Sequence, residues 1–205
     1  NVWSAGELDN TATVYFGDYD NDGDQDIISA NFHSAPGRVY RNDGDNAFTL
    51  AWTQPTDPTG LYSRDAKWGD YDNDGDLALF VARYVAWDPA KEPRCEVEGK
   101  LDFCHPKHYA ATTHAPFENR GNGTFADVSE VSGMAAHRGK GMSIAVADFS
   151  ADGFADLFVT NDRVFNQLFL NREGKRFDEV AFDWGVAVPG DGNPTSSMGT
   201  DAQDF

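Results

Sequence analysis

Short apolar runs on either side of an acidic turn recur along the chain. Before the turn at residues 148–156, Ile144 and Val146 alternate with small residues, which is typical of a strand with one buried face. After it, residues 157–159 form a continuous apolar run that ends at Asn161. Continuous runs of this length, bounded by turn residues, are typical of fully buried strands.

Each unit contains two further short apolar runs, separated by Asn- and Gly-rich turns of hairpin character. Examples are residues 39–40 or 168–170 and then residues 177–180. The pattern therefore predicts about four strands per unit. Because no window of helical length has a 3.6-residue apolar period, helix is expected only in short turns, with the insertion described below as a candidate place.

An acidic motif occurs three times in the chain. It reads DYDNDGDQD at 18–26, DYDNDGDLA at 70–78 and DFSADGFAD at 148–156. A second landmark recurs in step with it, an Asn six residues before a Phe with glycine between them. These asparagines are Asn42, Asn119 and Asn171. The chain is therefore a repeat protein, with a second turn in each unit.

The spacing of the motifs indicates an insertion in the second unit. The motifs begin 52 and then 78 residues apart, and the extra stretch of about 25 residues lies within 84–114. A fourth copy begins near the end of the chain, so we expect the natural polypeptide to continue. The predicted units are 11–60, 61–132 with the insertion at 84–114, 140–185, and the start of another at 198–205.

Four-stranded antiparallel units with a period of about 50 residues predict an all-β fold made of β-propeller blades. A β-sandwich is the rival. It explains alternating strands but gives no reason for an acidic loop and a turn to recur in step. We therefore expect residues 1–205 to form one propeller region that is part of a larger propeller.

The charge of the chain excludes some partners. It carries 34 acidic and 16 basic residues, a formal charge of −18, although 40% of its residues are apolar and suffice for a buried core. Nucleic-acid binding depends on basic side chains that displace counterions from phosphates, so it is excluded as an expected function. No window approaches the roughly 18 apolar residues that a membrane span requires, so membrane insertion is not expected either.

The acidic loops are predicted to bind calcium. Carboxylates about 4 Å apart repel each other by roughly 4 kcal/mol at an effective dielectric constant near 20, and a cation removes this cost. Ca²⁺ accepts six to eight oxygen ligands in flexible geometry, whereas Zn²⁺ prefers His or Cys. The loops begin like an EF-hand but lack its glutamate at position 12. The competing interpretation is a set of solvated turns, which three copies in register disfavour.

The three loops are not equivalent. Ala78 replaces the closing carboxylate of the second loop, and Ser150 replaces an Asp in the third. We therefore predict the tightest binding in the first loop, intermediate binding in the third and the weakest in the second. The expected ligands are Asp18, Asp20, Asp22, Asp26 and the carbonyl of Asp24 in the first loop, Asp70, Asp72 and Asp74 in the second, and Asp148, Ser150, Asp152 and Asp156 in the third.

Residues Phe16-Gly17 before the first loop and Val146-Ala147 before the third resemble FG-GAP/VCBS-type repeats, which build integrin-α-like β-propellers. The resemblance covers nearly the whole chain. It implies calcium ligands at loop positions 1, 3, 5, 7 and 9, which adds position 7 of the later loops, Asp76 and Phe154. Residues 115–129 and 146–161 are similar to secreted bacterial relatives of cartilage acidic protein. Such propellers commonly have seven blades, so closure would need further sequence or other chains.

Two cysteines lie in the insertion. The even count and the close spacing of Cys95 and Cys104 favour a disulfide in a secreted protein. The alternatives are a zinc site that adds His105 and His108, or haem attachment at Cys104-His105. Residues 108–109 beside Trp87 either line a ligand groove or pack as an aromatic surface loop. The sequence Asn122-Gly-Thr124 matches a glycosylation acceptor and also falls on the repeated hairpin turn.

Together these features predict a secreted, extracellular or periplasmic module stabilised by Ca²⁺. We expect it to act in adhesion, ligand binding or assembly, with a protein or carbohydrate ligand at the cell exterior and a capacity for self-association. We do not expect an enzyme, because the chain has no recognised catalytic motif. The alternatives are a polysaccharide lyase on the same fold and a structural subunit of a surface polymer.

Overall fold

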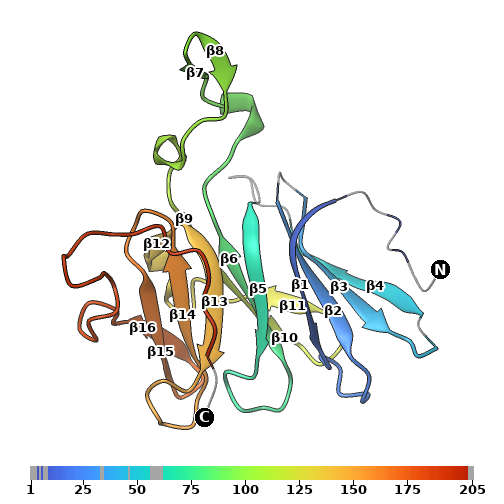
Figure 1. The fold of residues 1–205 in the computed structure, drawn as a ribbon. Coiled ribbons are helices and arrows are strands. Elements are labelled where there is room, and N and C mark those ends of the chain that lie inside the picture. The colour runs from blue at the N-terminus through green and yellow to red at the C-terminus, as the bar shows by residue number, and fades with distance from the viewer. Residues whose placement is uncertain are drawn as a thin grey trace.

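Three four-stranded antiparallel sheets lie side by side in the computed structural model of the chain (Figure 1). The model describes residues 4, 6, 9–32, 35–45, 47–55 and 62–202. The first sheet is a simple meander in which each strand pairs with the next along the chain. Its strands are β1 (Asn10–Gly17), β2 (Asp26–Phe32), β3 (Arg38–Asn42) and β4 (Phe48–Thr53).

The second sheet has the same order of strands, but a long insertion separates its two middle strands. The sheet consists of β5 (Ser63–Gly69), β6 (Ala78–Arg83), β10 (Ala115–Asn119) and β11 (Phe125–Asp127). Between β6 and β10 the chain forms an arm that projects from the sheets (Figure 1). The elements of this insertion are the 3₁₀ helices η1 (Pro89–Lys91) and η2 (Pro106–His108), the hairpin β7 (Cys95–Val97) and β8 (Lys100–Asp102), and β9 (Thr112–Thr113).

The third sheet repeats the meander of the first. It consists of β13 (Gly141–Ala147), β14 (Asp156–Asn161), β15 (Gln167–Arg172) and β16 (Arg176–Glu179). The short η3 (Met134–Ala136) and β12 (Arg138–Gly139) precede it, and β12 pairs with β9 of the insertion.

The all-β fold class and the four strands per unit are confirmed. Helix is confined to three-residue 3₁₀ turns in the described part of the chain, as the absence of a helical period predicts. The expected fourth unit at 198–205 lies partly outside the described residues.

The core lies between the sheets, and the strand period of two explains how. In β6, Leu79 and Val81 point toward the first sheet, whereas Phe80 and Ala82 point toward the third. All four are at most 4% exposed, so β6 is buried on both faces and reads as a continuous apolar run. Each fully buried Phe or Leu stabilises the fold by about 1.5–3 kcal/mol.

Glycines allow the inner strands of neighbouring sheets to approach closely. A Cβ atom on Gly17 of β1 would lie 2.5 Å from Cδ1 of Trp68 in β5. A Cβ on Gly69 of β5 would lie 2.8 Å from Cγ1 of Val146 in β13. The glycine directly before the acidic loop therefore makes room for a side chain of the next repeat.

A third apolar cluster covers the outer face of the last sheet. Leu168 and Leu170 of β15 pack with Ala181 and Ala187, which belong to the chain that follows β16. The sheet face that points away from the second sheet is therefore covered by the chain's own later residues.

Candidate metal centre

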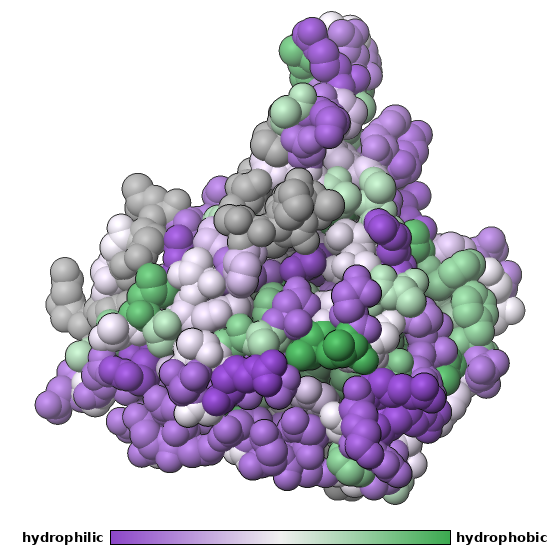
Figure 2. Space-filling view, turned by 180° about the vertical axis from the view of Figure 1, so that it is seen from behind, coloured by the Kyte–Doolittle hydropathy of each residue, from purple (hydrophilic) through white to green (hydrophobic). Residues whose placement is uncertain are grey.

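The three acidic loops lie at one edge of the molecule. They connect β1 to β2, β5 to β6 and β13 to β14, and all three hang below the sheets in Figure 1. The space-filling view shows strongly hydrophilic residues along this lower rim (Figure 2). Because each loop joins the first two strands of its sheet, the repeat places the acidic groups at equivalent positions.

The backbone of each loop turns in the same way. The residue at loop position 4 is left-handed in every copy, with φ of 59° at Asn21, Asn73 and Ala151. The glycine at position 6 has φ between 90° and 95°. L-residues other than Asn and Asp rarely adopt this conformation, so the glycine is needed for the turn, and Ala151 is the strained exception at position 4.

Carboxylates fold back onto the loop's own amides. In the first loop Asp18 accepts hydrogen bonds from the amides of Asp22 and Gly23, at 3.1 and 3.0 Å. Asp22 in turn accepts a bond of 2.9 Å from the amide of Asp24. The second and third loops repeat the bond from the position-6 amide to position 1 and the bond from position 7 to position 5. These bonds orient the carboxylates at positions 1 and 5, so that they point into the interior of the loop.

Two of the loops gather three carboxylates each. One ligand oxygen from each of Asp18, Asp20 and Asp22 lies within 4.8 Å of the others, and the second loop does the same. The second set consists of Asp70, Asp72 and Asp74. Burial first and then the neighbouring negative charges raise the pKa of Asp20. The pKa of Asp72 is raised in the same way, by burial and then by Asp74. Without a cation, the carboxylates of each cluster therefore repel one another.

The donor set fits a hard divalent cation. In addition to the clustered oxygens, Oδ1 of Asp70 is buried and has no hydrogen-bond partner among the described residues. Leaving a carboxylate oxygen buried and unpaired is costly, and a cation in the loop would satisfy it. Ca²⁺, which takes oxygen ligands in flexible geometry, suits this arrangement.

The third loop has a less negative centre. Ser150 donates a weak hydrogen bond of 3.4 Å to Asp148 in place of the carboxylate that the first two loops have at position 3. The hydrogen bond from the amide of Gly153 is the main cause that holds the pKa of Asp148 below its ordinary value. Backbone donors therefore stabilise the carboxylate of Asp148. With Ser150 at position 3, a bound cation would remove less repulsion between carboxylates than in the first two loops.

The position-9 carboxylates lie beneath the loops. Asp26 and Asp156 are fully buried. Asp26 accepts the amides of Tyr19 and Asn42, at 3.0 and 2.7 Å. Asp156 makes the equivalent pair of bonds in the third repeat. Each of these carboxylates therefore ties its loop to the second turn of its own unit, and in the second loop Ala78 has no such side chain.

The turn asparagines join neighbouring repeats. The side-chain amide of Asn119 donates to the carbonyl of Tyr19 in the preceding loop, at 2.8 Å, and to that of Leu77 in its own loop, at 3.2 Å. Asn171 does the same with Tyr71 and Ala155, at 2.7 and 3.0 Å. The sequence marks these residues as turn positions, but their reach into the previous repeat depends on the packing of the sheets.

A second link runs in the loops themselves. Asn21 donates to the carbonyl of Gly75 and to Asp76 Oδ1 in the next loop, at 3.1 and 2.8 Å. Asn73 donates to the carbonyl of Gly153 in the third loop, at 3.0 Å. The sequence motif alone gives loop position 4 no role, yet Asn21 and Asn73 connect one acidic loop to the next.

The arm contains the disulfide that the cysteine spacing favours. Cys95 and Cys104 are joined, so neither thiolate is available to the alternative zinc site or to haem attachment. Trp87 and Tyr109 line a cavity at the base of the arm, whereas His108 is not among the described residues that line it.

Residues 18–81 and 113–159 match the model of the FG-GAP-like repeat. The chain belongs to the FG-GAP-like repeat family. The stretch between the two matched segments contains the arm, so the arm interrupts an FG-GAP-like unit.

This FG-GAP-like repeat chain is also 38% identical over 68 residues to cartilage acidic protein 1 of Xenopus tropicalis. The match covers 32% of the chain and 10% of that relative. None of the helices in the described residues has the length and apolar character that crossing a bilayer requires. The family and the disulfide fit a module that works outside the cell.

Proposed function

We propose that the chain is a calcium-binding extracellular module that serves adhesion, ligand binding or assembly, with Ca²⁺ stabilising the loops between strands. The observation that supports it most directly is the convergence of three carboxylate oxygens in each of the first two loops. Membership of the FG-GAP-like repeat family and the disulfide support an extracellular setting. A protein or carbohydrate at the cell exterior is the proposed ligand, and self-association is proposed as well.

The proposed ligands follow the loop positions. Positions 1, 3 and 5 supply side-chain oxygens, position 7 supplies a backbone carbonyl, and the buried position-9 carboxylate closes the first and third sites. When bound, the cation would supply positive charge that removes the mutual repulsion of the carboxylates. The proposed set is Asp18, Asp20, Asp22, Asp24 and Asp26, then Asp70, Asp72, Asp74 and Asp76, and last Asp148, Ser150, Asp152, Phe154 and Asp156.

Calcium would act on the whole stack of sheets. The loops are linked to one another by Asn21 and Asn73, and the turn residues Asn119 and Asn171 fasten the first and second loops to the following repeat. A cation that orders one loop would therefore also order the hydrogen bonds that join this loop to the neighbouring repeat. At a free Ca²⁺ concentration 100 times the dissociation constant, one independent site adds about 2.7 kcal/mol to the free energy of unfolding.

Thermal melting with Ca²⁺ and with excess EGTA tests the proposal. We expect Ca²⁺ to raise the Tm. We also expect titration calorimetry to detect Ca²⁺ binding that weakens as the pH is lowered. The reason is that the pKa values of Asp20 and Asp72 are raised, so protons compete with the cation for these carboxylates. Asp18→Ala should lose more of the calcium-dependent shift than Asp70→Ala, with Asp148→Ala between them. Identical melting curves with and without Ca²⁺ would contradict the proposal, and a larger loss in Asp70→Ala would contradict the ranking alone.

A binding module has more support than a polysaccharide lyase. A groove of about 390 Å³ does lie beside Asp152, and it is lined by Arg172, Lys175 and Arg176. However, both arginines pair with Asp178, with N–O distances of 2.7 and 3.6 Å, and Lys175 pairs with Glu173 at 3.1 Å. The two arginines therefore share one carboxylate, the lysine has another, and Asp152 borders the same groove, which does not favour the stabilisation of an acidic sugar during catalysis.

A further inference from the structure

A cavity of about 440 Å³ lies at the base of the arm. This volume is within the range of roughly 300–1,000 Å³ that small-molecule pockets occupy. Aromatic rings form most of its wall, and one acidic side chain joins them. These lining residues are Tyr62, Tyr84, Trp87, Glu92, Phe103 and Tyr109.

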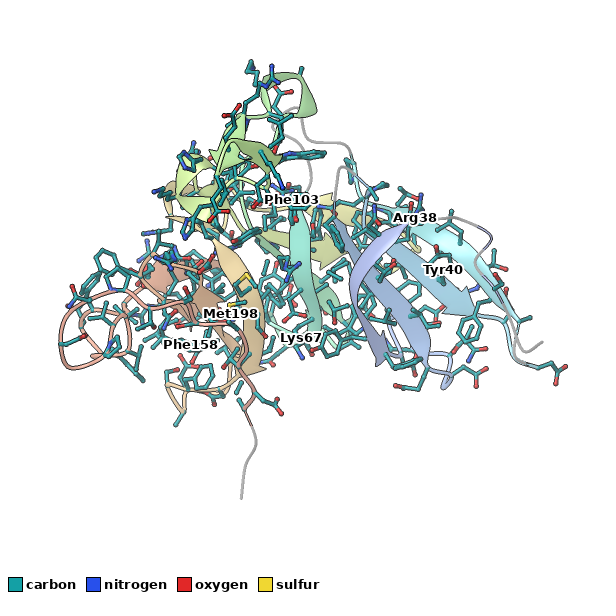
Figure 3. The ribbon with its side chains drawn as sticks, turned by 45° about the horizontal axis from the view of Figure 1, so that its top comes forward. Arg38, Tyr40, Lys67, Phe103, Phe158 and Met198 are labelled. Carbon is teal, nitrogen blue, oxygen red and sulfur yellow. A yellow bond between two sulfur atoms is a disulfide. The ribbon has the colours of Figure 1, made fainter. Side chains whose placement is uncertain are left out.

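The rings stand at angles to one another, as the walls of a cage do. The Tyr62 ring lies 5.7 Å from that of Tyr84, with 54° between their planes. It lies 6.2 Å from that of Trp87, at 83°. Phe103, which directly follows β8 of the arm, also borders the cavity, although its side chain is 96% exposed (Figure 3). The next residue, Cys104, lines the cavity as well, and its disulfide to Cys95 restrains the backbone there.

Glu92 gives the cage a negative charge. Its two carboxylate oxygens accept hydrogen bonds from the indole Nε1 of Trp87 and the hydroxyl of Tyr109. Both donors are neutral, and burial together with the bond to Glu92 raises the pKa of Tyr109 to about 12, so the phenol keeps its proton. Among the described residues that line the cavity, Glu92 is the one with a carboxyl group.

Much of the hydrogen-bonding capacity of the cavity is already used. The hydroxyl of Tyr84 donates to Oδ2 of Asp162, at 2.6 Å, and that of Tyr109 donates to Glu92. A sugar needs several donors and acceptors aimed at its hydroxyl groups, whereas these two phenols are committed to protein partners. The groups that a ligand would meet in the cavity are therefore chiefly ring faces and the carboxylate of Glu92.

We propose that this cavity binds an organic cation, an alkylated ammonium group that contacts the ring faces and pairs with the carboxylate of Glu92. Rings attract cations through their negative faces, and quaternary ammonium groups are recognised in aromatic cages of this kind. The same head group occurs on small molecules such as choline and on trimethylated lysine side chains of proteins. The proposal does not depend on calcium in the loops.

Choline and its neutral isostere 3,3-dimethylbutan-1-ol provide the test. They have nearly the same shape, and one carries a charged nitrogen where the other has carbon. We expect choline to shift the indole N–H resonance of Trp87 in ¹⁵N-labelled protein, a signal that Trp87→Phe assigns by its loss. Choline should bind at least about tenfold more tightly than the isostere. A peptide with trimethyllysine, compared with the same peptide unmodified, shows whether a protein side chain is the better source of the group.

Variants locate the binding. Glu92→Gln removes the charge and should weaken choline binding about tenfold while leaving the weak binding of the isostere unchanged. Phe103→Ala should weaken choline binding as well. Phe182→Ala is the matched control, because Phe182 is a 58% exposed ring outside the residues that line the cavity and should have no effect.

Equal binding of choline and the isostere overturns the proposal, because the charge would then have no part in recognition. So does the absence of any shift at Trp87, or binding of methyl β-glucoside in preference to choline. If Glu92→Gln lowers the Tm or disturbs the fold, the comparison of the two ligands on the unmodified chain still decides.

Discussion

His114 sets a pH limit on the stability of the fold. It is fully buried, its Nδ1 accepts the amide of Arg83 at 3.3 Å, and its Nε2 lies 2.9 Å from Oε1 of Gln167. This pattern requires the neutral ring with the proton on Nε2. Burial is the main cause that lowers the pKa of His114 to about 4. A second proton on Nδ1 would face the N–H of Arg83.

The folded state therefore binds fewer protons than the unfolded chain between about pH 4 and 6.5, and its stability falls as the pH falls through this window. We expect this histidine to cost about 2 kcal/mol between pH 7 and pH 5. Urea unfolding at the two pH values, in the unmodified chain and in His114→Gln, measures it. A variant with the same pH dependence as the unmodified chain would remove His114 as the cause.

Gly17 has no side chain, and this allows the ring of Trp68 in the next sheet to pack directly against its backbone. Gly17→Ala would place a methyl group 2.5 Å from the Trp68 ring, which is wedged between the sheets. We expect a loss of about 1–3 kcal/mol in the free energy of unfolding. Gly190→Ala is the control, because nothing lies within 4 Å of its added methyl group, and it should be nearly neutral. Similar urea midpoints for the two variants would contradict the packing argument.

At the level of residues, the sequence predicts what depends on local spacing. The carboxylates of Asp18, Asp20 and Asp22 are close because they alternate within one turn, and the structure brings them together. The partners of His114 and the reach of Asn119 are 31 to 100 residues away along the chain. Such contacts exist only after the sheets have packed, so no local pattern reveals them.

Among the structural elements, the turns after the third strands of the second and third sheets link each of these repeats to the one before it. Asn171 satisfies a carbonyl of its own loop, one of the preceding loop and, through its Oδ1, the amide of Gly174. Asn42 bonds the carbonyl of Gln25 in its own loop and the amide of Gly44. The two asparagines hold equivalent positions and differ in the contact to a preceding repeat.

This difference supplies a matched pair of variants. Asn171→Ala leaves buried carbonyls of two repeats unpaired and should cost about 3 kcal/mol in the free energy of unfolding. Asn42→Ala affects its own loop and should cost about 1 kcal/mol. Chemical denaturation of both variants in Ca²⁺ measures the contact between repeats. Equal losses of unfolding free energy in the two variants would show that the bond from Asn171 to Tyr71 does not stabilise the fold.

The strands themselves could largely be predicted. Apolar runs such as 157–159 lie within observed strands, because a strand that is buried on both faces of its sheet needs apolar residues at successive positions. The two-residue strands β9 and β12 were not predicted, since two residues such as Thr112–Thr113 have no period. They pair because the insertion returns to the third repeat.

In the whole molecule, the arm is the part least bound to the sheets. Its hairpin residues are largely exposed, and it stands away from the body (Figure 1). The disulfide between Cys95 and Cys104 closes a short loop, which in the chain-entropy model is worth roughly 3 kcal/mol. Because the crosslink lies within the arm, this stabilisation should be local.

We therefore expect the double variant Cys95→Ser, Cys104→Ser to keep the melting temperature of the three sheets. Its arm should be cut faster by trypsin after Arg94 or Lys100, both of which lie in the arm. Mass spectrometry of timed digests identifies the sites. A large fall in the melting temperature, with no change in the cleavage rate of the arm, would show that the disulfide supports the sheets instead.

The asparagine links between repeats all have one direction. Asn21 and Asn73 at loop position 4 donate forward to the next loop, and the turn residues Asn119 and Asn171 donate back to the previous one. The two ends of the stack are therefore chemically different surfaces. Copies that extended this pattern would join head to tail rather than about a two-fold axis, and such contacts form either closed rings or open filaments.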